Sequence, residues 1–312
     1  MDCPDACGKG GFSTAAQECG LATTGRGRFS PPAQSALLER PRDAIAWDRE
    51  IVSELVSVII PTLNEAENLR YVIPQISRRY ELIVVDGGST DGTVEVARAL
   101  RHDTIVVHQT GRGKGDALLC GFREASGEII VTFDGDGSAR AGEIPRFVRA
   151  LGESDFAKGS RFIEGGGSAD LTRVRSIGNR FLCGLVNLLH RTAYTDLCYG
   201  FNAFRRSCLP FMPDSAPGFE IETVMNIRIA RAGLRLVEVP SYEDLRQFGQ
   251  SNLHAFRDGF KILRVLIRER FRSKRGLQAA AERSAIAEPA STHGQAELVP
   301  VPEPVALAPM PD

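Results

Sequence analysis

The sequence predicts an α/β protein with a mainly parallel central sheet flanked by helices. Four short apolar runs rich in β-branched residues, at 55–61, 81–85, 104–109 and 128–138, are typical of strands buried on both faces. Segments with helical character separate these runs, and Gly-rich turns stand at several of the junctions. Strands and helices that alternate at this spacing indicate crossover connections, which produce a parallel sheet covered on both faces.

The composition bounds the domain organisation. Of 312 residues, 43% are hydrophobic and 25% are charged, which excludes a disulfide-stapled miniprotein, a collagen-like fibre and a wholly disordered chain. Residues 1–50 are rich in Gly, Ser, Thr and Pro, and 276–312 alternate Ala, Pro and Glu, so we expect both segments to be disordered. The globular domain is predicted over 51–255, and a basic amphipathic helix over 256–275.

Charge, cysteine content and hydropathy restrict the partners and the location. The formal net charge of −1 provides no global field that selects nucleic acid, so we expect no nucleic-acid partner. Seven scattered cysteines do not make a paired framework and favour a reducing compartment. No apolar run reaches the ~18 residues that a membrane span needs, and no signal peptide is apparent. We therefore expect a cytoplasmic protein that is either soluble or peripheral at the inner face of the membrane.

The first strand leads directly into a helix. The run at 55–61 ends in Pro61, and Thr62 or Asn64 is predicted to cap the helix that follows. Glu65 then stands near the positive end of that helix.

The second and third strands repeat this scheme. The run at 81–85 passes through a Gly-rich turn into a helix that Thr90 or Asp91 is predicted to open, and a helix over 113–125 follows the third strand. Ligands of open parallel sheets bind outside the carboxyl ends of the strands, where Asp86 stands in this chain.

Two aspartates end the fourth strand. Asp134 and Asp136 stand at i and i+2, so their side chains are expected on the same side, where they can share one cation. Mg²⁺ is typically held by one or two carboxylates together with phosphates of a substrate. A calcium loop is excluded, because Ala139 and Pro145 occupy the positions where that pattern requires Gly and Glu. The alternative is an Asx turn in which the neighbouring glycines supply positive φ angles.

A Gly-rich turn with two cations precedes the helix predicted over 113–125. Arg112 and Lys114 can meet a phosphate through their charge and through the free amides of the helix start. The turn is not a Walker loop, because Gly115 follows the lysine where that loop has Ser or Thr. The alternative is a solvated basic turn.

In their order and spacing these motifs form a joint pattern. VSVIIPTLNEAENL, VVDGGSTDGT, GKGDAL and FDGDG stand on consecutive strand ends. Over roughly 55–250 this pattern resembles the family 2 glycosyltransferases, which have the nucleotide-diphospho-sugar transferase (GT-A) fold. Within that family the chain is most similar to the polyprenyl-phosphate or dolichyl-phosphate mannose or glucose synthases. The similar segments are GSRF at 159–162, Arg175 in VRSIGNR, DLCYGFNAFRR at 196–206 and GFEIETVMNIRIARAGLRLVEVP at 218–240.

The resemblance implies a site for a GDP- or UDP-sugar at the strand ends. Asp134 and Asp136 match the DxD motif of this family. In the family this motif binds Mg²⁺ or Mn²⁺ at the diphosphate, and the metal neutralises the charge of the leaving nucleotide. Asp136 is therefore predicted to be catalytic. Ser138 stands where some of these synthases have Gln. The residues implied for the nucleotide are Pro61, Thr62, Asn64, Glu65, Asp86, Lys114 and Asp134.

The resemblance also implies a site for an acceptor phosphate and a closing segment. Arg161 and Arg175 match the arginines that such synthases use for the acceptor phosphate, and guanidinium forks suit phosphate; the alternative for the two arginines is surface ion pairing. Asn179 stands where a hydroxyl is common, and its amide can still donate to a phosphate. Arg246 and Ser251 resemble residues that close over the diphosphate, although Asn252 replaces a lysine of that motif.

Glu222 aligns with the acidic base of ordinary family 2 enzymes. An alcohol acceptor needs a base to take its proton, whereas a phosphate monoester is already ionised and needs none. Glu222 and its neighbour Glu220 are alternatively first-turn acids of a helix.

An apolar stripe at helical spacing runs through 256–275, beside a row of cations. Such a helix can lie at an anionic membrane surface; alternatively, its apolar stripe packs on the core. The stripe is Phe256, Phe260, Leu263, Ile267 and Phe271, and the cations beside it are Lys261, Arg264, Arg268 and Arg272.

The sequence therefore predicts an inverting, metal-dependent glycosyltransferase with a polyprenyl-phosphate-type acceptor. The alternative is a family 2 enzyme that acts on a hydroxyl acceptor in polysaccharide, glycolipid or natural-product synthesis. A sugar-phosphate nucleotidylyltransferase is disfavoured, because PTLNEAEN follows the first strand where those enzymes have a Gly-rich pyrophosphate loop. A non-catalytic binding module would be expected to lose the DxD aspartates, and both are present.

Overall fold

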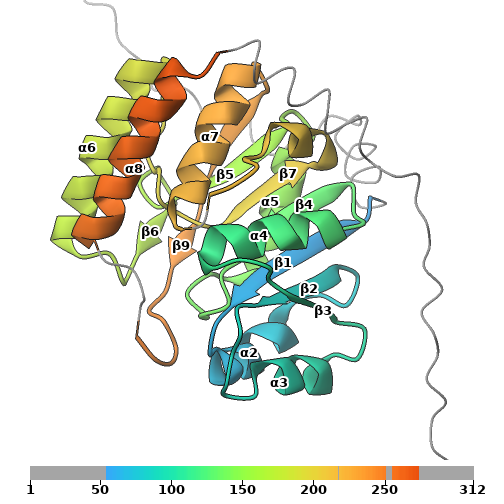
Figure 1. Ribbon diagram of the computed structural model, residues 1–312. Helices are drawn as coiled ribbons and strands as arrows, with labels where there is room; N and C mark the ends of the chain where they lie inside the picture. Colours follow the sequence, from blue (N-terminus) through green and yellow to red (C-terminus); the bar gives the residue numbers. More distant parts are fainter. Residues whose placement is uncertain (1–53, 217, 251–254, 274–312) are drawn as a thin grey trace, which may run out of the picture. The chain divides into compact units, whose positions relative to one another are not determined.

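A seven-stranded sheet forms the centre of the computed structural model, which describes residues 54–216, 218–250 and 255–273 (Figure 1). The sheet strands are β1 (Val56–Thr62), β2 (Glu81–Asp86), β3 (Ile105–His108), β4 (Ile129–Thr132), β5 (Phe156–Ser160), β7 (Asn202–Arg205) and β8 (Leu236–Pro240). Their order is β3-β2-β1-β4-β7-β5-β8, and β7 runs antiparallel to β4 and β5 while the other neighbouring pairs are parallel. The predicted mainly parallel sheet is confirmed. A small parallel sheet pairs β6 (Gly167–Ser168) with β9 (Tyr242–Glu243).

Helices cover both faces of the central sheet (Figure 1). The α-helices are α2 (Ala66–Val72), α3 (Thr93–Leu100), α4 (Gly113–Glu124), α5 (Ile144–Ala150), α6 (Arg173–His190), α7 (Glu220–Ala232) and α8 (Ala255–Phe271). In the described part of the chain, three short 3₁₀ helices occupy Ile73–Gln75, Ala141–Glu143 and Arg206–Phe211.

Two apolar cores lie between the sheet and these helices. One core joins the sheet to α2, α3 and α5, and the other joins it to α4 and α7. Along β1, Val58 and Ile60 enter the first core whereas Ile59 enters the second, so the strand is buried on both faces and only Pro61 is half-buried. This explains why the run at 55–61 is apolar at every position except Ser57 instead of alternating. α6 and α8 lie side by side against α7, with a third core between them (Figure 1).

The caps predicted for the helix after β1 were wrong. Thr62 is the last residue of β1, and Asn64 has a φ of 57° and accepts the Thr90 amide at 2.9 Å. α2 begins at Ala66, whose amide donates to Asp91 at 2.9 Å. Asn64 and Asp91 therefore cross-link the two loops after β1 and β2, and Asp91 also accepts the amide of Thr93, the first residue of α3, at 3.1 Å.

Several predicted segments lie outside the described residues. They are the two segments expected to be disordered, 1–50 and 276–312, and the closing residue Ser251. Among the helices that the structure describes, none has the length and apolarity to cross a bilayer.

Gly115 allows the first turn of α4 to contact the segment that precedes α7. A Cβ at this position would overlap the carbonyl group of Ala216, which is backbone and cannot rotate away. Gly115→Ala is therefore expected to lower the free energy of unfolding by about 3 kcal/mol, as overpacking does. Gly142→Ala is the matched control, because a Cβ there meets nothing within 4 Å. Urea unfolding measures both variants, and equal midpoints would contradict this close packing.

Candidate active site

A cavity of about 250 Å³ lies at the carboxyl ends of β1, β2, β3 and β4 and at the N-terminus of α4. We call it the strand-end cavity. It occupies the position where open parallel sheets bind their ligands. The predicted site residues that line it are Pro61, Thr62, Glu65, Lys114, Asp134, Asp136 and Arg246.

The two aspartates of the DxD motif lie in the turn after β4. The strand ends at Thr132, whereas the sequence predicted that it would extend to the aspartates. Both nevertheless line the strand-end cavity. The amide and hydroxyl of Ser138 donate to Oδ1 of Asp136 at 3.0 and 2.7 Å. Ser138, which replaces the Gln of some relatives, thus orients the second aspartate. Oδ2 of Asp136 lies 3.5 Å from Arg246.

The DxD pair suits a divalent cation that takes its other ligands from phosphate. The described part of the chain holds no cluster of three or more His, Cys, Asp or Glu that could bind a metal by itself. Mg²⁺ is usually held by one or two carboxylates together with substrate phosphates. Asp134 and Asp136 supply those two carboxylates at one cavity wall, so they fit Mg²⁺ or Mn²⁺ that binds together with a diphosphate.

Lys114 lies between two carboxylates near the N-terminus of α4. Its Nζ is 2.5 Å from Oδ1 of Asp134 and 2.8 Å from Oε1 of Glu222, which is buried in the first turn of α7. Burial raises the pKa of Glu222, and the Lys114 ammonium opposes that rise. For Lys114, burial acts to lower the pKa, but the two carboxylates outweigh burial and raise it. The lysine therefore remains charged and links the DxD turn to α7.

The segment 244–248 crosses over the DxD turn. Its backbone amides donate to the carbonyls of Ser138 and Asp136 at 2.8 and 3.1 Å. Arg246 donates to both carboxylate oxygens of Glu65 at 2.5 and 2.6 Å. Burial raises the pKa of Glu65, and Arg246 opposes the rise. The predicted closing residue Arg246 thus lies between the loop after β1 and the DxD turn.

Two residues predicted to bind the nucleotide shape the neighbouring loops and do not line the cavity. Asp86 is buried and accepts the amides of Gly88 and Ser89 at 3.0 and 3.1 Å. Asn64 holds the Thr90 amide, as described above. Their role in nucleotide binding stays a prediction.

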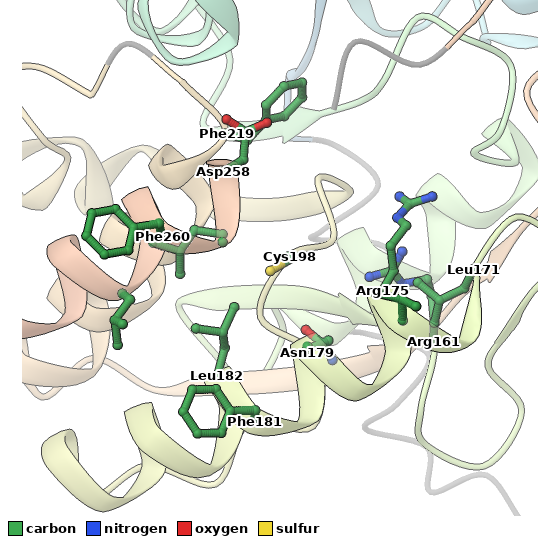
Figure 2. A pocket seen from close by; sticks show the side chains of 15 residues that line it. Arg161, Leu171, Arg175, Asn179, Phe181, Leu182, Cys198, Phe219, Asp258 and Phe260 are labelled. Atoms are coloured by element: carbon green, nitrogen blue, oxygen red, sulfur yellow. The ribbon is translucent and has the colours of Figure 1, made fainter. Parts of the chain in front are cut away.

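A second cavity of about 350 Å³ lies between α6 and α8 (Figure 2). We call it the apolar groove. Phe181 of α6 and Phe260 of α8 line one part of it, and Arg161 and Arg175 lie together at the other side (Figure 2). Phe219, at the start of α7, lines both this groove and the strand-end cavity. The two cavities therefore adjoin.

The two predicted acceptor arginines have different surroundings. Arg161 is buried and donates to Asp196 at 2.7 and 3.0 Å and to Glu243 at 2.9 Å, so both sides of its guanidinium are already paired. Arg175 is partly exposed and contacts Asp170 at 2.8 Å. Arg175 is therefore the better placed of the two to meet an incoming anion.

The third predicted acceptor residue, Asn179, is buried in α6 and lines the groove. Its amide nitrogen donates to the Thr195 carbonyl at 3.3 Å, and its oxygen accepts the Leu197 amide at 3.0 Å. These two bonds hold the loop that carries Asp196. Asn179 thus positions the partner of Arg161.

Several residues at the site were missed by the sequence analysis. Phe219 was overlooked because an aromatic residue before a helix carries no distinctive pattern. Gln109, at the end of β3, lines the strand-end cavity. A Cβ at Gly200 would lie 2.6 Å from Oδ2 of Asp134, so this glycine makes room for the DxD carboxylate. The glycine stands in the DLCYGFN segment but gains its role from the fold.

Known proteins similar to this chain are glycosyltransferases. The model of "Glycosyl transferase family 2" matches residues 57–210. The chain is 33% identical over 224 residues to glycosyltransferase AglJ of Haloferax volcanii, covering 69% of this chain and 72% of that protein.

Two further relatives are named for polyprenyl-phosphate substrates. The dolichol-phosphate mannosyltransferase of Pyrococcus furiosus is 33% identical over 224 residues, covering 68% of this chain. The chain spans only 63% of that protein's length. The undecaprenyl-phosphate mannosyltransferase of Micrococcus luteus is 33% identical over 218 residues, covering 64% of this chain and 87% of the relative.

The fold is shared with a solved glycosyltransferase structure. Glucosyl-3-phosphoglycerate synthase from Mycobacterium tuberculosis, crystallised with Mn²⁺, UDP and phosphoglyceric acid, superposes with a TM-score of 0.58 at 24% identity, covering 76% of this chain and 86% of that one. At that identity the likeness supports the fold alone. Together with the family match and the relatives, it shows that this chain is a GT-A glycosyltransferase belonging to glycosyl transferase family 2.

Proposed function

We propose that this enzyme transfers a sugar from a GDP- or UDP-sugar to a polyprenyl phosphate, with inversion at the anomeric carbon and with Mg²⁺ or Mn²⁺. The observation that carries the proposal is the pair of adjoining cavities of different chemistry. The strand-end cavity offers carboxylates and cations for a nucleoside diphosphate, and the apolar groove offers aromatic and aliphatic walls for a lipid chain. Phe219 stands where the two meet.

The donor would lie in the strand-end cavity. Pro61 and Thr62 would contact the nucleoside, and the N-terminus of α4 would face the diphosphate with its free amides. Asp134 and Asp136 would hold the metal, which when bound supplies positive charge to the departing diphosphate. Lys114, fixed by Glu222, adds a second cation on the same side.

The acceptor would enter through the apolar groove. Its polyprenyl chain would lie between Phe181 and Phe260, and its phosphate would reach Arg175. Arg161, which is already paired with Asp196 and Glu243, would hold the loop around Asp196 beside that phosphate. The names of the Pyrococcus and Micrococcus relatives, which specify dolichol phosphate and undecaprenyl phosphate, support this acceptor class.

The transfer would be a single displacement. An ionised phosphate oxygen attacks the anomeric carbon from the groove side while the bond to the nucleoside diphosphate breaks on the opposite side. No covalent enzyme intermediate is required, so the work of the protein is to align the two substrates and exclude water.

Glu222→Gln separates this proposal from the alternative of a hydroxyl acceptor. With polyprenyl phosphate the variant should keep its rate within about tenfold, because the nucleophile needs no base and Gln can still accept a bond from Lys114. With an alcohol acceptor the loss should be about 10²- to 10⁴-fold, the usual contribution of a general base.

The measurement is release of nucleoside diphosphate from a panel of nucleotide sugars, with either acceptor. Glu220→Gln is the control on the same helix turn. Turnover of an alcohol that Glu222→Gln abolishes, with none on polyprenyl phosphate, would select the alternative.

A further inference from the structure

A row of polar side chains crosses the otherwise apolar layer between the central sheet and α7. One residue each from β4, β7, β5 and β8 stands opposite the next in register. Two residues away on the same strands, the side chains belong to the core that packs on α4 and α7, so the polar row faces the same side. The row is Thr132, Asn202, Lys158 and Glu238, and the apolar row beside it is Ile130, Phe204, Phe156 and Leu236.

Lys158 is a fully buried lysine in the middle of this row. Within the described residues, the only hydrogen bond of its ammonium goes to the Gly159 carbonyl at 3.2 Å. Burial alone would raise the pKa of Asp196, but Arg161 and then Lys158 lower it below its ordinary value. The ammonium is therefore compensated by a carboxylate, yet two of its three donors need further acceptors.

Polar atoms without a hydrogen-bond partner lie on both sides of this layer. Asn202 is 1% exposed, and its amide nitrogen donates to Thr132 and to the Gly200 carbonyl at 3.3 and 3.1 Å, but its Oδ1 has no partner among the described residues. On α7, Asn226 is also 1% exposed, and neither atom of its amide has a partner there. The hydroxyl of Thr223, one turn earlier, is buried and unpartnered as well. We call Lys158, Asn202, Thr223 and Asn226 the buried polar cluster.

Asn226 stands where α7 meets the loop 194–198. Its carbonyl accepts the hydroxyl of Tyr194 at 2.7 Å. The next residue, Thr195, donates its amide and its hydroxyl to Glu238 at 2.9 and 2.7 Å. Because Glu238 is the end of the polar row, the loop joins this row to the turn of α7 that carries Asn226.

The unpartnered atoms need a ligand that both donates and accepts hydrogen bonds. The Oδ1 of Asn202 can only accept, whereas the Lys158 ammonium can only donate and the Asn226 amide can do both. The ammonium would repel a metal cation, and the carboxylates of Asp196 and Glu238 would repel an anion. Water satisfies both kinds of atom, and a buried water typically makes about three hydrogen bonds to groups that lack other partners.

We propose that the buried polar cluster is a binding site for ordered internal water. The water molecules bridge Lys158 and Asn202 on the sheet to Asn226 on α7. None of these three residues lines the strand-end cavity or the apolar groove, so the site is separate from both substrate cavities. The bridges help to hold the loop 194–198, which carries Asp196 and so fixes Arg161.

Cross-relaxation between water and the parent protein tests the site directly. With ¹⁵N-labelled asparagine, the side-chain amide of Asn226 should show nuclear Overhauser transfer from water, with the sign of a long-lived bound water. Asn68 is the control, because it is buried and its amide bonds only to Glu65 and Phe248, so it should show no transfer. Equal behaviour of the two amides would overturn the proposal.

The direction of a change in melting temperature gives a second test. In a hydrated site Asn226→Leu removes partners of the water and leaves the other atoms of the cluster unpaired, so the melting temperature should fall by at least about 3 °C. In a dry site the same change would remove two unpaired polar atoms, and the melting temperature would rise. A rise would therefore overturn the proposal.

A matched pair of threonine variants completes the test. Thr104, directly before β3, also has an unpartnered buried hydroxyl but lies outside the cluster. Thr223→Val should lower the melting temperature, whereas Thr104→Val should leave it unchanged or raise it. Equal shifts would contradict water binding at the cluster. The cross-relaxation measurement uses the parent protein, so it decides the question even where a variant fails to fold, and none of these measurements depends on sugar transfer.

Discussion

Asp136→Ala is expected to lower kcat/KM for sugar transfer by at least about a thousandfold. This corresponds to about 4 kcal/mol of lost transition-state stabilisation, which is within the range of a metal ion's contribution. Asp136 lines the strand-end cavity, and Ser138 holds its carboxylate in place. Release of nucleoside diphosphate measures the rate, and calorimetry with Mn²⁺ and a nucleoside diphosphate measures metal-linked binding.

Asp214→Ala is the control for this variant. Asp214 is an exposed carboxylate that does not line either cavity, and its loss should change neither measurement by more than about twofold. An Asp136→Ala variant that retained metal-dependent transfer at the parent rate would contradict the assignment of the DxD motif.

Lys114→Met is the second variant with a large expected effect. It removes the cation between Asp134 and Glu222 and leaves Glu222 buried without its ion-pair partner. The loss of one partner of a buried pair typically costs 3–5 kcal/mol, so we expect the free energy of unfolding to fall by about 3 kcal/mol at neutral pH. Transfer should slow by at least about a hundredfold, because a cation near the diphosphate is lost as well.

The stability loss in Lys114→Met should depend on pH. Burial already raises the pKa of Glu222, and removal of the ammonium raises it further. A raised pKa of Glu222 in the folded state favours the protonated carboxyl. The loss of folding stability is therefore absent below the pKa of an unfolded glutamate, about 4.3, and grows as the pH rises from there through the folded-state pKa. Unfolding at pH 5 and pH 8 should therefore show the larger loss at pH 8.

A double variant separates the structural role of Lys114 from its role in the reaction. Lys114→Met combined with Glu222→Gln removes the unpaired charge and should recover most of the stability, while transfer stays slow. Recovery of both stability and rate would mean that Lys114 serves only to hold Glu222. No recovery of stability would contradict the buried ion pair.

The parts of the fold that follow from local pattern were predictable. The apolar runs of β1, β2, β3 and β4 identify strands buried on both faces, and crossover spacing gives their parallel arrangement. The residues at their carboxyl ends then identify the site, as Asp134 and Lys114 illustrate. Helix starts were less predictable, because Asp91, in the loop after β2, accepts the amide of Ala66, the first residue of α2.

The parts that depend on distant partners were not predictable. The motif around Arg161 indicates a phosphate-binding arginine, but Asp196 and Glu243 reach its guanidinium only through the fold. The periodicity of 256–275 indicates an amphipathic helix without showing which face is covered. Contacts with α6 and α7 bury Leu266 and leave Phe271 exposed.

Detection of the lipid product is the most direct test of the central claim. The full chain would be incubated with Mn²⁺ or Mg²⁺, a panel of GDP- and UDP-sugars and a short polyprenyl phosphate, and the lipid fraction would be analysed by mass spectrometry. The account predicts a polyprenyl-phosphate sugar with inverted anomeric configuration, formed in equal amount to the released nucleoside diphosphate and absent with Asp136→Ala. No glycosylated lipid with any donor, while an alcohol acceptor is glycosylated, would contradict it.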